Sequence, residues 1–332
     1  MNASRTPPAP GTIGAALEHA AAALEALDLA GAGAPPPPRA TAPPADSSAP
    51  ARADAEELVG RLLGLSRTAI YVERTKPLPP DAWVRLADWL ARRAAGEPVQ
   101  YITGRAAFRS LDLAVSPAVL IPRPETEGLV EAVLEVLRAE RARWPAPRVL
   151  DLGTGSGAVA LAIAAEWPAA AVTATDASEE ALALARANAE ALELSPRVRF
   201  ARGDWFDAVG ADETFEVVVS NPPYIAEAER DSLPREVRGF EPAAALFSGA
   251  TGLEAVREII DGAPRHLVTA GLLALELAEM RASEVAAWLE GAHDWARVEL
   301  REDLAARPRV LLARRERGPA IAPRQWPGEA LA

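Results

Sequence analysis

The chain of 332 residues contains no cysteine and only three histidines. Without cysteine, disulfide bonds, thiolate catalysis and cysteine-ligated zinc or iron–sulfur sites are excluded. The histidines, His19, His266 and His293, lie far apart in the sequence and show no metal-ligand spacing, so we expect no metal site. The absence of cysteine also fits a reducing, cytoplasmic environment.

The sequence also lacks an excess of positive charge and a long apolar run. Its formal net charge is −12, whereas proteins that grip nucleic-acid phosphates usually present a basic face. No apolar run reaches the ~18 residues of a membrane span, and the first residues lack the apolar stretch of a signal peptide. We therefore expect a cytoplasmic, monomeric protein with no direct nucleic-acid partner and no membrane partner.

Helical patterns dominate the N-terminal part of the chain. Apolar residues recur there at steps of three and four. Two helix caps are predicted. One is at Asp54, which Glu57 follows three residues later, and the other is at Asp81, which follows a run of prolines. We predict a helical domain over residues 1–96. Its predicted helices cover residues 11–29, 53–67 and 77–97.

Two segments show no such pattern. Residues 30–52 contain seven prolines in 23 positions and no apolar periodicity, which predicts a disordered insertion within the helical domain. A proline-rich docking motif is the alternative, although nothing in the segment selects it. We also expect residues 317–332 to be a disordered tail.

The pattern then changes to strands. Short alternating runs over residues 97–122 predict a β-hairpin that links the helical domain to a second domain over residues 123–316. From residue 148, strands alternate with helices, which indicates a doubly wound, mostly parallel sheet. The last two strands are joined too closely for a parallel crossover and should pair antiparallel. Predicted strands are 148–152, 171–176, 197–203, 215–221, 271–277, 296–302 and 307–315, and the predicted helices include 158–166, 178–192 and 252–266.

Six parallel strands with one antiparallel strand resemble the Rossmann-like, α/β class I fold of methyltransferases that depend on S-adenosylmethionine (SAM). The strand that ends at Asp151 runs into a turn whose glycines allow close approach to a ligand, at the sheet edge where such folds bind ligands. Its G-x-G-x-G spacing differs from the dinucleotide fingerprint and resembles the SAM loop. A glycine-rich turn without a ligand is the alternative. The predicted cofactor residues in this turn are Asp151, Gly153, Thr154, Gly155, Ser156 and Gly157.

The next two strands add three predicted cofactor residues. Asp176 can accept hydrogen bonds from ribose hydroxyls, a device that NAD enzymes share, so it indicates a nucleoside rather than SAM in particular. Asp204 can accept from the adenine amino group, and Trp205 can lie against the adenine ring. A core aromatic is the alternative role for Trp205.

The fourth strand ends at Asn221, which we also expect to contact the cofactor because this end of the strand lies beside the SAM site, and the chain continues as Pro222, Pro223 and Tyr224. The prolines stiffen the loop, so that the Asn221 side chain and the Pro222 carbonyl offer two fixed oxygens to one NH2 group. Tyr224 offers a flat face to a planar amide or base. Orientation and stabilisation of the charge developing on nitrogen would then drive methyl transfer. A proline-rich turn that merely closes the strand is the alternative.

The sequence at this point resembles the HemK/PrmC family of protein-(glutamine-N5) methyltransferases. The resemblance covers residues 11–29 and 53–315. It rests on "GEPVQYITGRAAFRSLDLAVSPAVLIPRPETE", with its IPRPETE loop, and on "DLGTGSGAVALA", "GDWF", "NPPY" and "VRGFEPAAAL", in the expected order. NPPY alone also occurs in DNA and RNA amino-methyltransferases, but the signature region with NPPY is specific.

The resemblance implies that the substrate is the glutamine of the GGQ motif in peptide chain release factors, which the helical domain would help to dock. It also implies that Gly153 to Gly157, Asp176 and Trp205 bind SAM, and that Asn221 to Tyr224 bind the glutamine. Methylation of a base in rRNA or DNA, and a SAM-binding protein that docks a partner without turnover, are the rival functions.

The sequence departs from the family pattern at two places. Glu276 is followed by "LAEMRAS", without the usual glycine and glutamine. In "DLAARPR", Asp303 and Arg309 are kept but Ala306 stands where the family has glycine. Both departures bear on local turn geometry rather than on the chemistry.

Overall fold

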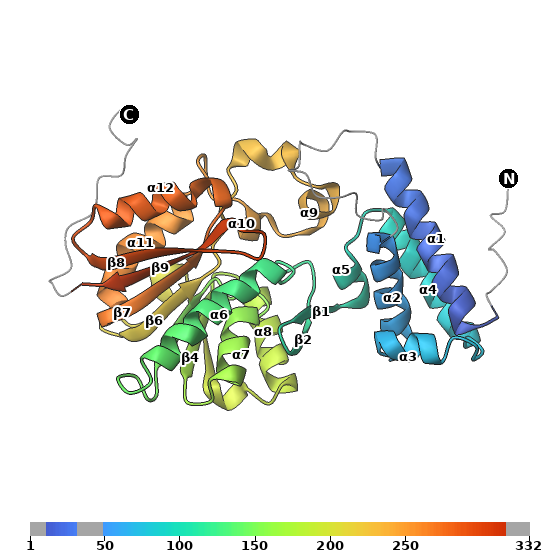
Figure 1. The fold of residues 1–332 in the computed structure, drawn as a ribbon, viewed down its shortest axis with the longest axis horizontal. Coiled ribbons are helices and arrows are strands. Elements are labelled where there is room, and N and C mark those ends of the chain that lie inside the picture. The colour runs from blue at the N-terminus through green and yellow to red at the C-terminus, as the bar shows by residue number, and fades with distance from the viewer. Residues whose placement is uncertain (1–10, 32–48, 317–332) are drawn as a thin grey trace. The chain divides into compact units, whose positions relative to one another are not determined.

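The computed structural model describes residues 11–31 and 49–316 (Figure 1). They form two compact units. The helical unit contains the described residues up to Gly104 together with Arg235–Phe240, and the sheet unit contains Arg105–Pro234 and the described residues from Glu241 onward. The division falls later than the predicted boundary at residue 96, because Val99 and Ile102 are buried in the core of the helical unit.

The helical unit packs small and branched apolar side chains between its helices. Leu17, Leu58 and Leu86 are almost fully buried at its centre. An ion pair of 3.0 Å between Arg93 and Glu236 holds the segment that returns late in the chain. Its helices are α1 (Ile13–Gly31), α2 (Ala49–Leu63), α3 (Arg67–Val72), α4 (Pro80–Ala94), α5 (Val99–Thr103) and α9 (Arg235–Phe240).

Both predicted helix caps are wrong. Asp54 lies inside α2, because the helix begins at Ala49 and buries Ala51 and Ala55 ahead of the leucines. Asp81 lies in the first turn of α4, because Pro80 takes the first helical position, where a missing N–H costs no hydrogen bond.

The predicted disordered insertion is wrong at its two ends. Residues 30–31 belong to α1 and residues 49–52 belong to α2. Residues 32–48 of the insertion, and the predicted tail over residues 317–332, lie outside the described residues.

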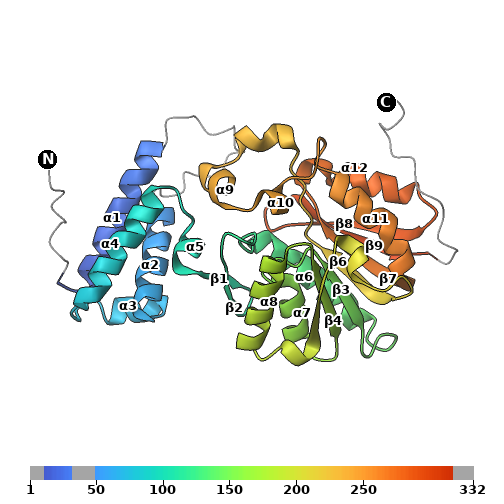
Figure 2. The ribbon, with the colours of Figure 1, turned by 180° about the vertical axis from the view of Figure 1, so that it is seen from behind.

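The sheet unit confirms the predicted seven-stranded, mostly parallel sheet (Figures 1 and 2). Its strand order is β5-β4-β3-β6-β7-β9-β8, in which the first five strands run parallel. β9 pairs antiparallel with both β7 and β8. The strands are β3 (Arg148–Leu152), β4 (Ala171–Asp176), β5 (Val198–Arg202), β6 (Phe215–Ser220), β7 (Leu267–Glu276), β8 (Trp295–Glu302) and β9 (Pro308–Arg315).

Helices cover both faces of this sheet, as the buried strands require. Val149 and Val217 face a core that includes residues of α6 and α7, whereas Leu150 and Val218 face a core that includes residues of α11 and α12. The helices of this unit are α6 (Pro124–Ala139), α7 (Ala158–Glu166), α8 (Glu179–Ala191), α10 (Ala243–Leu246), α11 (Glu254–His266) and α12 (Glu279–Glu290). Short 3-10 turns are η1 (Ser195–Arg197), η2 (Trp205–Ala208) and η3 (Glu227–Ser232).

The start of α6 corrects a sequence-based expectation. The IPRPETE segment was expected to be a loop, but Pro124 is the first residue of α6 and its neighbours form the first turn. Proline fits this position for the same reason as in α4. Thr126 is thereby fixed on a helix.

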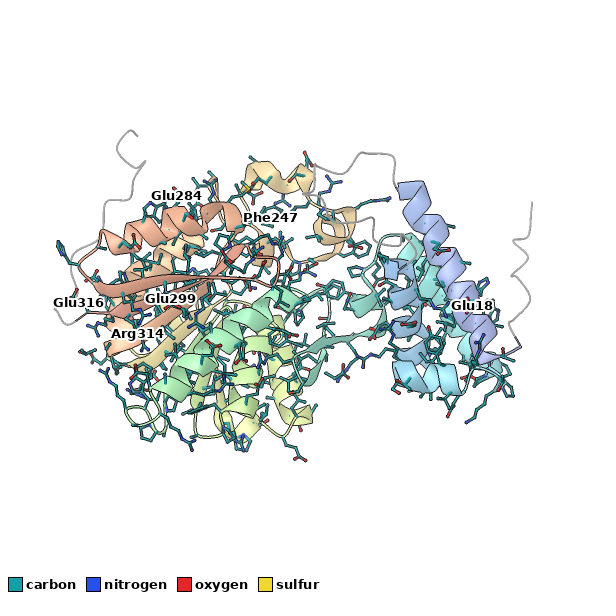
Figure 3. All side chains as sticks on the ribbon, viewed as in Figure 1. Glu18, Phe247, Glu284, Glu299, Arg314 and Glu316 are labelled. Carbon is teal, nitrogen blue, oxygen red and sulfur yellow. The ribbon has the colours of Figure 1, made fainter. Side chains whose placement is uncertain are left out.

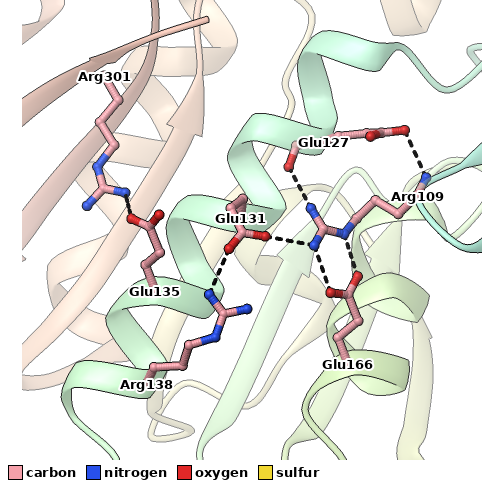
Figure 4. A network of polar contacts seen from close by, with 7 residues as sticks. All are labelled: Arg109, Glu127, Glu131, Glu135, Arg138, Glu166 and Arg301. Carbon is pink, nitrogen blue, oxygen red and sulfur yellow. Dashed lines mark hydrogen bonds and ion pairs between the residues drawn. The ribbon is translucent and has the colours of Figure 1, made fainter. Parts of the chain in front are cut away.

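The hairpin predicted over residues 97–122 is present only over its middle, as β1 (Arg105–Phe108) and β2 (Leu111–Ala114). Its predicted first part is wrong, because residues 99–103 form α5 and bury Val99 and Ile102 in the helical unit, whereas the hairpin belongs to the sheet unit. Asn188 of α8 accepts from the Ala114 N–H at 2.7 Å and donates to the Ala114 carbonyl at 3.0 Å. At the hairpin turn, Arg109 pairs at 2.7 Å with Glu131 of α6 and with Glu166 at the end of α7 (Figure 4). The hairpin is therefore anchored at both of its ends.

Candidate functional site

A pocket of about 370 Å³ lies over the carboxyl ends of β3, β4, β5 and β6, which is the expected ligand position in an open α/β sheet. Its volume falls within the roughly 300–1,000 Å³ usual for ligand sites. The predicted site residues that line it are Asp151, Gly153, Thr154, Gly155, Ser156, Asp176, Asp204, Trp205, Asn221 and Pro223. Gly157, Pro222 and Tyr224 are not among the lining residues.

The glycine-rich turn needs its glycines for two different reasons. Gly155 has φ 56° and open space where a Cβ would stand, so its bare backbone leaves room beside the pocket. Gly157 has φ 86°, and a Cβ there would stand 2.9 Å from Leu161 Cδ1 and 3.3 Å from Ala185 Cβ. Gly157 therefore serves the packing of α7, while Gly155 serves the pocket.

Asp151 is buried beneath this turn. Its Oδ2 accepts hydrogen bonds from Thr154 Oγ1 at 2.6 Å and from the Ala160 N–H at 3.2 Å. Burial raises the pKa of Asp151 to about 7, these two bonds oppose the rise, and the charge of Asp176 adds to it. An ammonium group in the pocket would favour the ionised carboxylate, so Asp151 fits the methionine end of SAM.

Asp176 and Trp205 also line the pocket. Asp176 accepts from the Gly155 N–H at 2.8 Å and from the Ser178 N–H at 2.9 Å, so each oxygen is fixed and keeps a second lone pair for a hydroxyl. The Trp205 ring both lines the pocket and packs against the core. Both roles considered for Trp205 are thus compatible.

The loop after β6 is held by contacts with β3, with the segment around Phe247 and with Gly252. Ser220 Oγ donates to the Leu152 carbonyl at 2.7 Å, which locks the end of β6 to β3. Ile225 exchanges hydrogen bonds with the segment that contains Phe247, which is labelled in Figure 3. The guanidinium carbon of Arg230 lies 3.9 Å from the centroid of the Phe247 ring. Gly252 passes so close that a Cβ there would stand 2.6 Å from the Tyr224 carbonyl oxygen.

Asn221 itself is held at one end only. Its Nδ2 donates to Thr126 Oγ1 at 3.1 Å. Among the described residues no hydrogen bond reaches its Oδ1 or the Pro222 carbonyl oxygen. The two oxygens proposed to receive an NH2 group are therefore unengaged within the described chain.

The last residue of β7, which is the strand next to β6, is a buried glutamate. Glu276, the last residue of β7, is 1% exposed, and within the described residues its Oε2 has no hydrogen-bond partner. Burial raises the pKa of Glu276 to about 6, while the neighbouring Thr126 hydroxyl and the charge of Arg309 oppose the rise. Burial, reinforced by the charge of Glu276, raises the pKa of Tyr224 to about 12, so the phenol stays neutral at ordinary pH.

Ala306, which stands where the family has glycine, lies in the turn between β8 and β9. Ala306 adopts φ 56°, the left-handed conformation that glycine tolerates best. The turn keeps its shape because Asp303 Oδ1 accepts from the Ala305 and Arg307 N–H groups at 2.8 and 3.1 Å. Arg309 donates to the carbonyl of Leu277, next to Glu276, at 3.1 Å.

Sequence reasoning missed three residues that shape the site: Thr126, Asn188 and Gly252. Thr126 was within a quoted motif, but its role depends on the helix that brings it to Asn221. Asn188 donates at 2.9 Å to the carbonyl of Ser156 and so joins the glycine-rich turn to the hairpin. No local pattern marks Asn188 or Gly252, since their partners are distant in sequence.

The fold and the pocket together define a class I methyltransferase. In agreement, a family model described as Methyltransferase small domain matches residues 130–237, and one described as PrmC N-terminal domain matches residues 45–104. Over residues 11–31 and 49–316, no helix has the length and apolar character needed to cross a membrane, and no group of three His, Asp or Glu side chains could hold a metal ion.

The chain belongs to the release factor glutamine methyltransferase family. A protein of that name from Koribacter versatilis is 41% identical over 271 residues, which cover 82% of this chain and 93% of the relative. The one from Pseudomonas aeruginosa is 43% identical over 79% of this chain and 92% of its own length. The one from Rhodopirellula baltica is 39% identical over 78% and 88%. The predicted family is confirmed.

Proposed function

We propose that this protein transfers the methyl group of SAM to the side-chain amide nitrogen of the glutamine in the GGQ motif of peptide chain release factors. The carrying observation is Asn221, which lines the pocket with its nitrogen bound to Thr126 and its oxygen unengaged among the described residues. The names of the relatives support the same substrate.

When bound, SAM supplies an electrophilic methyl group on a positively charged sulfur. The protein's task is to present an amide nitrogen, which is a poor nucleophile because its lone pair is delocalised into the carbonyl. Asn221 Oδ1 and the Pro222 carbonyl each accept one hydrogen of the glutamine NH2, so the nitrogen is held facing the methyl group. The same oxygens stabilise positive charge that develops on the nitrogen.

When SAM is bound, the residues at the ends of β3, β4 and β5 would hold it. The backbone from Gly153 to Ser156 and the Asp151 carboxylate would bind its methionine end. Asp176 would accept from the ribose hydroxyls, Asp204 would accept from the adenine amino group, and Trp205 would pack against the adenine ring. Gly157 acts through the packing of α7 instead of by contact.

The proposal includes a cytoplasmic monomer that needs no metal and no nucleic acid. Orientation of the amide against an already activated methyl group supports transfer without a metal. Chelation with EDTA should then leave the rate unchanged.

One labelling experiment tests this function. The purified protein is incubated with methyl-labelled SAM and either a release factor or total RNA, and the product is mapped by mass spectrometry. We expect one methyl group on the GGQ glutamine, and none on a release factor whose GGQ glutamine is replaced by alanine. Label in RNA alone would instead identify a base methyltransferase, and SAM binding without any transfer would identify a docking protein.

A further inference from the structure

The lining of the pocket includes two segments that lie far apart in the sequence. One is the glycine-rich turn from Gly153 to Ser156, and the other follows the hairpin strand β2, of which residues 118–120 line the pocket. A ligand can contact both segments at once only if their relative position is fixed. The contact that fixes it is made by a residue of α8 that is not among the lining residues.

The side chain of Asn188, on α8, bridges the two segments. Its Nδ2 donates to the Ser156 carbonyl at 2.9 Å and to the Ala114 carbonyl at 3.0 Å, and its Oδ1 accepts from the Ala114 N–H at 2.7 Å. In both views of the ribbon, α8 lies beside the hairpin (Figures 1 and 2). One carboxamide thus joins the end of the hairpin to the glycine-rich turn.

These three hydrogen bonds also fix the direction of the Asn188 carboxamide. Two carbonyl oxygens require donors and one N–H requires an acceptor, and a carboxamide offers both kinds of group. After a half-turn of the carboxamide, its oxygen would face the two carbonyls and its NH2 group would face the N–H, so all three bonds would be lost. Asn188 is 2% exposed, so water cannot take their place.

The bonds to Ala114 fix how the chain leaves the hairpin. Ala114 is the last residue of β2 and pairs with Arg105 of β1 on one side. On its other side, its N–H and carbonyl both bond to Asn188, as they would to a neighbouring strand. The next turn follows at once, because the Ser116 carbonyl accepts from the Val119 N–H at 3.1 Å. Residues 118–120 therefore start from a fixed position.

We propose that Asn188 is a positioning residue for the cofactor, which holds the glycine-rich turn and residues 118–120 in the relative position that SAM binding requires. Loss of its carboxamide should weaken SAM binding although every residue that lines the pocket is unchanged. This consequence rests on the proposed function, because it takes SAM as the ligand of the pocket.

The direct test is the Kd for SAM, measured by calorimetry on two variants. Asn188→Asp keeps the shape of the side chain but turns an oxygen toward the carbonyls of Ser156 and Ala114, and Asn188→Ala leaves these carbonyls without a partner. For both variants we expect the Kd for SAM to rise by about tenfold, as the loss of a buried hydrogen-bond partner implies. A Kd that stays at the wild-type value in both variants overturns the proposal.

A matched control separates positioning from a general loss of stability. Leu194 follows α8, is 7% exposed, packs in the same core as Ala189 of α8 and does not line the pocket. Leu194→Ala should therefore lower the free energy of unfolding, as Asn188→Ala does, but leave the Kd for SAM near the wild-type value. If Leu194→Ala weakens SAM binding as much as Asn188→Ala, affinity merely follows stability and the proposal is wrong.

Kinetics should show the same separation. In both Asn188 variants the KM for SAM should rise with the Kd, while kcat at saturating SAM stays near the wild-type value, because Asn221 and its loop are unchanged. A loss of kcat with an unchanged Kd for SAM would contradict the positioning role. If the wild-type protein binds no SAM, the proposed function fails; if wild type and both variants bind SAM equally, only the role of Asn188 fails.

A measurement on the wild-type protein decides the case if neither Asn188 variant folds. The chain has three asparagines, Asn2, Asn188 and Asn221, so ¹⁵N labelling gives three side-chain amide pairs, and Asn2→Ala and Asn221→Ala assign the other two. If the bonds of Asn188 favour SAM binding, SAM must favour these bonds equally. SAM should therefore slow hydrogen exchange of the Asn188 NH2 group more than that of the backbone amides of β9. Equal slowing, or none, overturns the proposal.

Discussion

The two halves of the pocket satisfy their polar atoms in opposite ways. In the cofactor half, formed by the turn after β3 and by Asp176, the carboxylates are bonded to the turn itself: Asp151 to Thr154 and Ala160, and Asp176 to Gly155 and Ser178. In the acceptor half, Asn221 Oδ1 accepts no hydrogen bond from the described residues. Outside the pocket lining, Glu276 Oε2 and the Nε of Arg309 also make no hydrogen bond within the described residues, although Arg309 Nε is ion-paired with Asp303 at 3.7 Å.

The cofactor half is therefore preformed, whereas the acceptor half keeps polar atoms that make no hydrogen bond within the described chain. The cofactor half keeps its shape through its own hydrogen bonds and through the packing at Gly157. The acceptor half leaves Asn221 Oδ1 without a hydrogen bond from the described chain, so this oxygen can accept one from a substrate. Substitutions in the first half should therefore change stability, and those in the second should change transfer.

The largest effect is expected at the acceptor half. Asn221→Ala removes one of the two oxygens and should reduce methyl transfer by about 10³-fold or more, as loss of a preorganised polar group does elsewhere. SAM affinity, measured by calorimetry, should stay within about tenfold, or ~1.4 kcal/mol. Loss of SAM binding on this change would place Asn221 in the cofactor half and erase the contrast.

Substitutions in the cofactor half should lower the free energy of unfolding. Gly157→Ala combines a left-handed backbone with a contact of 2.9 Å to Leu161, and should cost about 2–4 kcal/mol in the free energy of unfolding. The matched control is Gly155→Ala, which has the same kind of backbone but open space and should cost about 1–2 kcal/mol. Urea unfolding compares the two, and equal losses would show that packing at Gly157 is unimportant.

The pH dependence of stability probes Asp151. Its folded pKa of about 7 lies above the ordinary value of 3.8, so the unfolded chain ionises first as the pH rises. The stability it contributes is present below about pH 4 and is lost between about pH 4 and 7. Asp151→Asn keeps an oxygen for Thr154 and Ala160 but cannot ionise.

Wild type should therefore lose stability relative to Asp151→Asn between pH 5 and pH 8, by an amount on the order of 2 kcal/mol. Urea unfolding of both proteins at the two pH values measures it. A constant difference between them would mean that Asp151 titrates normally in the folded protein.

The smallest effect is expected at the turn between β8 and β9. Ala306→Gly relieves the left-handed conformation of Ala306 and should raise the free energy of unfolding by about 1 kcal/mol. Methyl transfer should not change, because the turn already holds its shape through Asp303. A loss of transfer would show that the alanine side chain takes part in the acceptor half.

Much of this organisation could be predicted from the sequence. The period of the apolar residues and the short final connection predicted the sheet, and the motifs predicted the family; both predictions are confirmed. Helix starts were predicted less well, because proline at the first helical position and alanines on a buried face give weak signals, as at Pro80 and Ala51. The roles of the predicted site residues remain predictions.

The sequence by itself determined the order of strands and helices and the residue types that end each strand at the pocket, because periodicity and turn chemistry are local. Only the tertiary structure decided which of these residues touch the pocket and what orients them. Gly157 serves the packing of α7, and Thr126 meets Asn221 although the two residues lie 95 positions apart in the chain. Such contacts form only when α6 and the loop after β6 pack together, and they are therefore a property of the packed fold.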